Sequence, residues 1–526
     1  MESFDHIIVG GGTAGCVIAS RLIATGSRRV LLLEAGGSDR RFWIRLPVGY
    51  GRTFTDPRVN WMYEGEPDAG LAGRRGYIPR GKVLGGSGSI NAMVYVRGLP
   101  HDYDDWRDLG NPGWGFDDVR PFFELAEQRI QRTDISPFAH LLTRAWLESC
   151  RHLGLPSTPD FNGPQPEGVG IYRFTTRDGV RESTATCYLR PVEKASNLTL
   201  RLRSRVLRLL MKDRRAIGVC YTHAGRTVEA NATRAVVLCA GAINTPQLLQ
   251  LSGIGPAALL EQHGIPVLAD HPAVGRHLQD HLAVSYFFRS TVPTLNNELY
   301  PWHGKLRAIT RYLRSRSGPL SMSVNQAGGF VRSDASQPHA NLQLYFNPMT
   351  FSTSPGRHRR LLSPDPFPGF LLSCQSCRPT SRGQVKIRSA NPLTAPLIYA
   401  NSLSTEKDLA EVIAGTRLLR EIAATRPLRD YAAAEIRPGI ETQSDAERLE
   451  DFRQRAGSIY HPVGTCRMGA DPREAVVDSR LRVHGIAGLR IIDASVFPTV
   501  TSGNTNAPTI MVAEKGAAMM IEDPEA

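Results

Sequence analysis

The stretch 5–22, which reads DHIIVGGGTAGCVIASRL, decides the fold of this chain. Its apolar start predicts a β-strand, the glycine-rich segment 10–15 predicts a tight turn, and the apolar residues that follow predict a helix. A second apolar run, RVLLL at 29–33, predicts another strand and leads directly into Glu34. Strand, glycine turn, helix, strand and acid in this order are typical of an α/β dinucleotide-binding unit.

Each glycine of this unit has a physical role. Gly10 permits the tight turn, Gly12 lets the backbone approach a pyrophosphate, and Gly15 lets the helix pack close to the sheet. The free N–H groups and the positive end of the helix would face the phosphates. Glu34 can accept hydrogen bonds from a ribose, and its charge disfavours a 2′-phosphate. The motif by itself leaves FAD and NAD open.

Length and composition limit the classes of function that this chain can have. A chain of 526 residues can hold more than one domain, and its formal net charge of +13 comes from basic residues spread along the chain. Because there is no block of like charge, zinc-finger spacing or RNA-binding aromatic motif, we expect a solvated basic surface and no nucleic acid partner. Contact with an anionic membrane surface stays open.

Targeting and metal-binding signals are sparse. No apolar run reaches 18 residues and the first strand begins almost at Met1, so we expect neither a transmembrane helix nor a signal peptide. The eight cysteines are scattered. The CxxC spacing at 374–377 has no second pair or histidine cluster, so we interpret it as part of an apolar strand and expect no metal. These features favour the reducing cytoplasm, with peripheral attachment to the inner membrane left open.

Two later stretches predict further walls of the nucleotide site. The stretch 80–98, RGKVLGGSGSINAMVYVRG, has small residues at 85–89, whose bare backbone can lie against a planar ligand or offer N–H groups to phosphate. We expect a helix after it. The stretch 235–249, AVVLCAGAINTPQLL, predicts a strand, small residues and a helix start that approach the same cofactor.

The fold class is therefore α/β, with a Rossmann-like cofactor domain interrupted by a second domain. We expect the second domain to be α+β, with a mixed antiparallel sheet and helices suited to substrate binding. Its strands are predicted at 341–346 and 383–387, and a helix at 405–424. The predicted domain segments are 1–155, 197–281 and 456–526 for the cofactor domain, and 156–196 and 282–455 for the substrate domain.

Together these motifs resemble the glucose–methanol–choline (GMC) oxidoreductases. The resemblance rests on the turn 10–15 with Glu34, on 80–98, on 241–256, and on Tyr460-His461-Pro462 with Asn504-Thr505-Asn506, in the family's order over nearly the whole chain. It is strongest to bacterial choline dehydrogenase-like, L-sorbose dehydrogenase-like and aliphatic alcohol dehydrogenase-like members. It implies FAD as the cofactor.

The resemblance also implies roles for individual residues. His461 matches the catalytic histidine, a base that takes the hydroxyl proton as hydride leaves for flavin N5. Asn504 matches the second catalytic position, and His281 is expected to be structural. The glycine turn and the resemblance together predict a cofactor site of Gly10, Gly12, Thr13, Ala14, Gly15, Glu34, Ala35, Val83, Gly85, Gly86, Asn91, Ala92, Met93, Val94, Val206, Ala240, Asp493, Ala494 and Asn506.

Three departures from the family pattern qualify the prediction. Ile90 stands where some relatives attach the flavin through histidine, so we expect non-covalent FAD. Gln326 stands where choline-type relatives are expected to carry an acid, which weakens a choline specificity. The segment 133–139 is shorter than in relatives, which predicts a changed entrance.

We therefore expect FAD-dependent oxidation of a small primary alcohol to its aldehyde, with oxygen or a quinone- or dye-type acceptor. Choline or sugar dehydrogenation, a hydroxynitrile lyase of the same fold, and an NAD-dependent dehydrogenase are the alternatives.

Overall fold

The predicted nucleotide-binding unit forms at the N-terminus of the computed structural model, which describes residues 2–352 and 363–523. Strand β1 (Glu2–Val9) leads through the glycine turn into α1 (Thr13–Ile23), and β2 (Val30–Leu33) follows. The turn forms as expected because Gly10 has a φ of +106°, in the left-handed region that favours glycine.

A seven-stranded sheet is built around β1, in the order β10-β2-β1-β13-β12-β11, with β24 beside β13. The pairs of β1 with β2 and β13, of β10 with β2, and of β24 with β13 are parallel, whereas β11, β12 and β13 pair antiparallel. The strands added to β1 and β2 are β10 (Leu198–Arg201), β11 (Val206–Lys212), β12 (Arg215–His223), β13 (Arg226–Leu238) and β24 (Leu489–Ile491).

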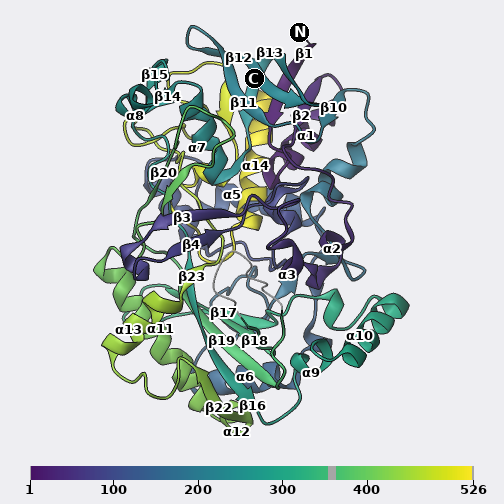
Figure 1. The fold of residues 1–526 in the computed structure, drawn as a ribbon, viewed down its shortest axis with the longest axis vertical. Coiled ribbons are helices and arrows are strands. Elements are labelled where there is room, and N and C mark those ends of the chain that lie inside the picture. Colours follow the sequence, from purple (N-terminus) through teal and green to yellow (C-terminus); the bar gives the residue numbers. More distant parts are fainter. Residues whose placement is uncertain (1, 353–362, 524–526) are drawn as a thin grey trace.

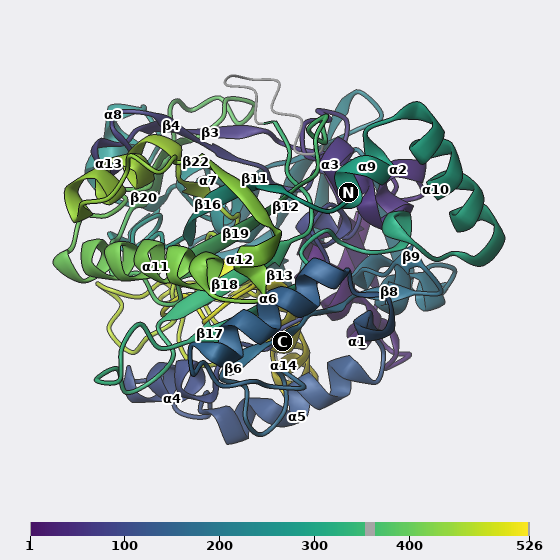
Figure 2. The same cartoon turned by 90° about the horizontal axis from the view of Figure 1, so that it is seen from below.

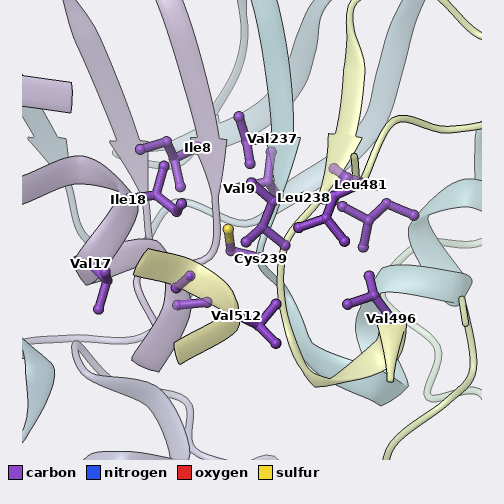
Figure 3. Packing of buried hydrophobic residues seen from close by; sticks show 14 of the residues in the cluster. Ile8, Val9, Val17, Ile18, Val237, Leu238, Cys239, Leu481, Val496 and Val512 are labelled. Atoms are coloured by element: carbon purple, nitrogen blue, oxygen red, sulfur yellow. The ribbon is translucent and has the colours of Figure 1, made fainter. Parts of the chain in front are cut away.

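The core of this half lies between the sheet and two helices. Helix α1 packs beside the C-terminal helix α14 (Asn506–Glu522), and both contribute to one buried apolar cluster with β1 and β13. Figure 3 shows Ile8 and Leu238 from the strands gathered with Ile18 of α1 and Val512 of α14. Segments from both ends of the chain therefore form one core.

A second seven-stranded sheet lies in the lower half of Figure 1, in the order β22-β16-β19-β18-β17-β6, with β23 beside β16. All of its described pairs are antiparallel. Its strands are β6 (Gly168–Ile171), β16 (Leu282–Ser290), β17 (Ala327–Val331), β18 (Leu342–Asn347), β19 (Gly369–Ser376), β22 (Ala432–Arg437) and β23 (Gly457–Ser458).

Period-two alternation gives this sheet two different faces. One face carries buried side chains such as Tyr286, Phe346 and Leu372, which pack under helices α6 (Leu141–His152) and α11 (Glu406–Ala424). Figure 2 shows these two helices on that side of the sheet. The opposite face is left to line a cavity, described below.

Most predicted elements are confirmed, including strands from all three predicted segments of the interrupted α/β domain, which join one sheet, and the helix at 405–424. The helix expected after Ser89 is wrong. A 3₁₀ turn at Gly86–Ser89 gives way to non-helical chain, in which Asn91 accepts from the Met93 amide, Met93 has a φ of +67°, and Val94 bridges to Phe174. A side-chain turn of this kind competes with helix formation.

Two elements pack in a different part of the fold from the one that their predicted domain segment implies. Helix α6 falls within 1–155 but packs on the second sheet. Strand β20 (Gln384–Lys386), expected in the substrate sheet, pairs only with β21 (Leu397–Tyr399) among the described strands and contacts α7 (Gly241–Leu251). The domain boundaries therefore stay a prediction, while the alternation of segments between two sheets is visible.

Candidate active site

A cavity of about 270 Å³ opens at the carboxyl ends of β1, β2 and β13. Ligands of open parallel sheets bind at this edge. The predicted cofactor residues that line it are Gly10, Gly12, Thr13, Ala14, Glu34, Ala35, Gly86, Asn91, Ala92, Met93, Val94, Val206, Ala240, Asp493, Ala494 and Asn506. Gly15, Val83 and Gly85 are not in its lining, and FAD contact at each position stays a prediction.

The glycines form a bare backbone cradle. A Cβ on Gly86, whose φ is +56°, would lie 2.7 Å from the Gly12 Cα, so Gly86 excludes a side chain where the stretch 80–98 meets the first turn. A Cβ on Gly15 would lie 1.9 Å from the Gly10 carbonyl oxygen, which confirms its role in helix packing. Such a cradle fits a pyrophosphate, which needs close backbone approach.

Two helix N-termini meet at this cradle. Helix α1 begins at Thr13 and α14 begins at Asn506, and the Thr13 hydroxyl donates to Asn506 Oδ1 at 3.0 Å. Their unpaired backbone amides and positive dipole ends favour an anion. The side-chain bond fixes one terminus against the other.

Glu34 lines the cavity at the carboxyl end of β2, and its carboxylate is already held by backbone amides. Oε2 accepts from the Gly11 amide at 2.9 Å and Oε1 from the Gly36 amide at 2.7 Å. Burial nevertheless raises the pKa of Glu34 to about 7. Each carboxylate oxygen keeps a second lone pair, so the group can still accept from a ribose hydroxyl.

Asp493 lines the cavity, and its carboxylate accepts hydrogen bonds from three neighbouring groups. Its Oδ2 accepts from the Gly241 amide at 2.8 Å and from the Thr245 hydroxyl at 2.7 Å, and Oδ1 accepts from the Ser495 amide at 2.8 Å. These bonds tie the end of β24 to the first turn of α7. Burial raises the pKa of this carboxyl.

The two predicted catalytic residues lie together. Asn504 Nδ2 is 3.1 Å from His461 Nε2. Both residues line the nucleotide cavity and a second cavity of about 1200 Å³ that shares this wall. The imidazole therefore lies on the wall that the two cavities share.

A third residue, His281, contacts this pair, although the sequence predicted only a structural role for it. His281 Nδ1 is 3.0 Å from His461 Nδ1, and His281 Nε2 is 2.8 Å from the Cys377 carbonyl oxygen. Burial lowers the pKa of His281 to about 4 and lowers that of His461 well below its ordinary value, so both rings are neutral near pH 7. No spacing signal connects His281 to His461, which lie 180 positions apart.

This chain of contacts assigns the tautomers. A carbonyl oxygen only accepts, so His281 Nε2 carries the proton and donates to Cys377. His281 Nδ1 is then bare and accepts from the His461 Nδ1–H. His461 Nε2 is in turn bare and accepts from the Asn504 amide. The nitrogen that faces both cavities is thus the basic one.

The backbone of His461 is held separately. Asp280 Oδ1 accepts from the amides of His461 at 2.7 Å and His281 at 2.8 Å, and Oδ2 accepts from Ser458 at 2.5 Å. Burial raises the pKa of Asp280 to about 6. Arg80 donates to the carbonyl of Tyr460, a residue with a φ of +76°. Sequence reasoning missed Asp280, although it adjoins His281.

The second cavity is walled by the open face of the antiparallel sheet. Alternate residues of three neighbouring strands line it: Ala283, Ser285 and Phe287 of β16, Tyr345 and Asn347 of β18, and Leu371 and Ser373 of β19. The buried Tyr345 hydroxyl and Asn504 Oδ1 have no hydrogen-bond partner among the described residues. Buried polar atoms are normally paired, so these two fit a ligand hydroxyl. Tyr345 had no sequence signal beyond strand alternation.

The interpretation of Gln326 as a substrate-facing position is wrong. Its Oε1 accepts from the His140 amide at 2.9 Å and the Thr143 hydroxyl at 2.7 Å, at the start of α6 and off the cavity. The preceding residue, Asn325, lines the cavity instead. Among the described lining residues the only carboxylates are Glu64 and Glu66, from β3 (Tyr63–Pro67) and not from the sheet.

Comparison with known proteins identifies the family. Family models described as GMC oxidoreductase match residues 4–283 and 379–513. The chain belongs to the GMC oxidoreductase family. It is accordingly an FAD-dependent oxidoreductase that acts on CH–OH donors.

Relatives of this GMC oxidoreductase match it over almost its whole length. It is 40% identical to an oxygen-dependent choline dehydrogenase of Vibrio vulnificus, covering 99% of this chain and 94% of that one. It is 38% identical to an alcohol dehydrogenase [acceptor] of Pseudomonas putida, covering 98% and 96%. Among solved structures, pyridoxine 4-oxidase from Mesorbium loti has a TM-score of 0.88 at 29% identity, covering 99% of both chains.

The described residues of this GMC oxidoreductase form neither a metal-ligand cluster nor a membrane-spanning helix. Within 2–352 and 363–523, no group of three or more His, Cys, Asp or Glu side chains is placed to hold a metal ion. Over the same residues, no helix combines the length and apolar character needed to cross a bilayer.

Proposed function

We propose that this enzyme oxidises a small primary alcohol to its aldehyde, with His461 as the general base. The observation that carries the proposal is the Cys377–His281–His461–Asn504 chain, which leaves a bare imidazole nitrogen on the wall between the two cavities. A neutral base within hydrogen-bond reach of a substrate hydroxyl is what proton removal requires. Depression of its pKa by burial keeps it neutral.

Side chains of the protein bind the substrate and remove its proton. The buried Tyr345 hydroxyl donates to the substrate oxygen, so that the substrate O–H can donate to His461 Nε2 in place of the Asn504 amide. His461 Nε2 takes the hydroxyl proton and becomes a cation that donates through Nε2 and through Nδ1 to His281. FAD, held by the glycine cradle, supplies the hydride acceptor. The alcohol thus loses one proton to the protein and one hydride to the cofactor.

Because burial lowers the pKa of His461, its imidazole is a weak base before the substrate reacts. The cation that forms at His461 would be held by its Nδ1–H bond to His281, and bound FAD would supply the hydride acceptor beside it. Asn504 adds a polar group that does not compete for the proton. This arrangement favours proton removal only when an alcohol and the cofactor are both in place.

The cavity favours an uncharged alcohol over a quaternary ammonium. Arg437 lines it with its guanidinium 4.4 Å from the Phe287 ring centroid, and Glu66 is paired with Arg75 at 3.0 Å and with Arg388 at 2.5 Å. Glu64, the other carboxylate among the described lining residues, also comes from β3, so no carboxylate of the sheet face is available to balance a cation. Although relatives named choline dehydrogenase exist, we infer an aliphatic, aromatic or sugar-like primary alcohol.

FAD is bound without a covalent link in this proposal. Ile90 lines both cavities and packs with Ile44, Val59 and Val83 in a small buried cluster. An aliphatic side chain offers no nucleophile to the flavin. Acid precipitation of the purified enzyme should therefore release the yellow colour into the supernatant.

The decisive experiment is anaerobic bleaching of the flavin by a panel of primary alcohols, with choline in the panel. Bleaching by uncharged alcohols, followed by a peroxide assay in air and by quinone or dye reduction, identifies both substrate and acceptor. Cyanide release from mandelonitrile without any bleaching would instead make the protein a lyase and refute the proposal.

A further inference from the structure

Helix α10 (Trp302–Ser315) presents an apolar stripe to solvent. At about 100° per residue, Trp302, Leu306, Ile309 and Leu313 lie within about 60° of one another around the helix, over a length of about 16 Å. They are 76%, 55%, 46% and 70% exposed, respectively. Isolated exposed apolar residues are ordinary, whereas a continuous stripe marks an interaction surface.

The helix touches the rest of the protein along a different line. Only Gly304, Ala308 and Tyr312 are buried, spaced by four residues, and the Tyr312 hydroxyl donates to the Gly179 carbonyl at 3.0 Å. Two small residues and one anchored tyrosine hold α10 against the body of the protein. Its apolar stripe therefore remains uncovered by any described part of the chain.

Basic residues accompany the stripe. The sequence of α10, WHGKLRAITRYLRS, contains no acid. Lys305, Arg307 and Arg314 are exposed and have no carboxylate partner among the described residues. Glu298 of α9 (Leu295–Leu299) is the nearest acid in sequence. The surface around the stripe is thus strongly positive.

A second element adds apolar surface on the same side of the molecule. Helix α2 (Phe42–Arg45) lies on the same side of the molecule as α10 in Figure 1 and Figure 2. Its Phe42 and Trp43 are 66% and 42% exposed. The Arg52 guanidinium lies 5.6 Å from the Trp43 ring centroid. Exposed aromatic rings with cations beside them are typical of residues that sit at a membrane–water interface.

We propose that α10, with Phe42 and Trp43, docks this enzyme in the plane of an anionic lipid bilayer. A basic amphipathic helix with tryptophan on its apolar face is the structure that enters the headgroup region of such a bilayer. A second copy of the chain is a poorer occupant, because it would bring the same uncompensated cations face to face. Anionic headgroups supply the missing counter-charge.

Vesicle flotation of the FAD-loaded enzyme tests this surface. The enzyme should float with vesicles of phosphatidylcholine mixed with phosphatidylglycerol, bind pure phosphatidylcholine far less, and detach as salt is raised. Each charge removed in Lys305→Gln, Arg307→Gln and Arg314→Gln should weaken binding about fivefold. The triple variant Trp302→Ser/Leu306→Ser/Leu313→Ser should weaken it at least about tenfold.

A matched control uses exposed leucines elsewhere. Leu109 and Leu393 are 55% and 62% exposed and lie outside α2 and α10, so Leu109→Ser/Leu393→Ser should float like the wild type. Flavin content and the unfolding midpoint of each variant verify its fold. The proposal is overturned if the wild type does not float, if the α10 triple variant floats as well as the control, or if that variant merely turns a dimer into a monomer.

Discussion

His281 should govern the rate of flavin reduction although it is placed to touch neither substrate nor cofactor. In the wild type, the wrong tautomer of His461 would set two bare nitrogens against each other at 3.0 Å and two N–H groups against each other at 3.1 Å. His281→Leu removes the first of these constraints. The Asn504 amide can then turn and accept from an Nε2–H, which occupies the nitrogen needed as the base.

The size of the effect follows from the bonds lost. An unsatisfied buried donor costs about 1 to 3 kcal/mol, so the productive tautomer should become about 5 to 150 times rarer. The rate of anaerobic flavin bleaching at saturating alcohol should fall by that factor. The alcohol concentration giving half that rate should change little, because His281 is a positioning residue.

Two variants sharpen the assay. His281→Asn places an amide oxygen near the position of Nδ1, where it can still accept from His461, and should restore the rate to within about fivefold of the wild type. His271 is also buried, and neither of its ring nitrogens has a hydrogen-bond partner in the described part of the chain, so His271→Leu controls for the loss of a buried imidazole. If His281→Leu, with full flavin content, reduces its flavin within about twofold of the wild-type rate, the tautomer argument is wrong.

Three further predictions follow from burial and close backbone approach. Because burial lowers the pKa of His461 well below 6.5, kcat/KM should stay flat as pH falls from about 8 to 6.5, and a decline centred at 6.5 would contradict the assignment. Gly86→Ala forces a Cβ to within 2.7 Å of backbone and should lower both flavin content and the free energy of unfolding, the latter by about 1 to 3 kcal/mol. Gly26→Ala, also at positive φ but with nothing within 4 Å, controls for strain alone. Burial raises the pKa of Glu34 from 4.5 to about 7, so the folded apoprotein binds this proton more tightly than the unfolded chain and loses stability as pH rises through that window. Urea unfolding of Glu34→Gln apoprotein should lack this part of the pH dependence, and an unchanged profile would show that Glu34 does not titrate there.

Local pattern was enough for much of the fold. The glycine turn after β1, the strand ending at Glu34 and the long helix α11 depend on residues close in sequence, whose period and backbone freedom are visible without any partner. The recurrence of strand patterns after long insertions also predicted the sharing of two sheets among alternating segments. His461 and Asn504 came from motif resemblance, and the structure brings them within 3.1 Å.

Tertiary structure alone decided how those residues act. The extended chain after Ser89 depends on a bridge from Val94 to Phe174. The Gln326 side chain points toward the start of α6 because it accepts hydrogen bonds there. No local sequence pattern specifies either contact. The basic nitrogen of His461 is chosen by His281, a residue 180 positions away. Hydrogen bonds between distant segments carry no periodic signature in the sequence, because they depend on where the backbone places each side chain. A motif therefore indicates which residues take part in the chemistry, whereas only the folded chain determines which atom of each residue acts and where it points.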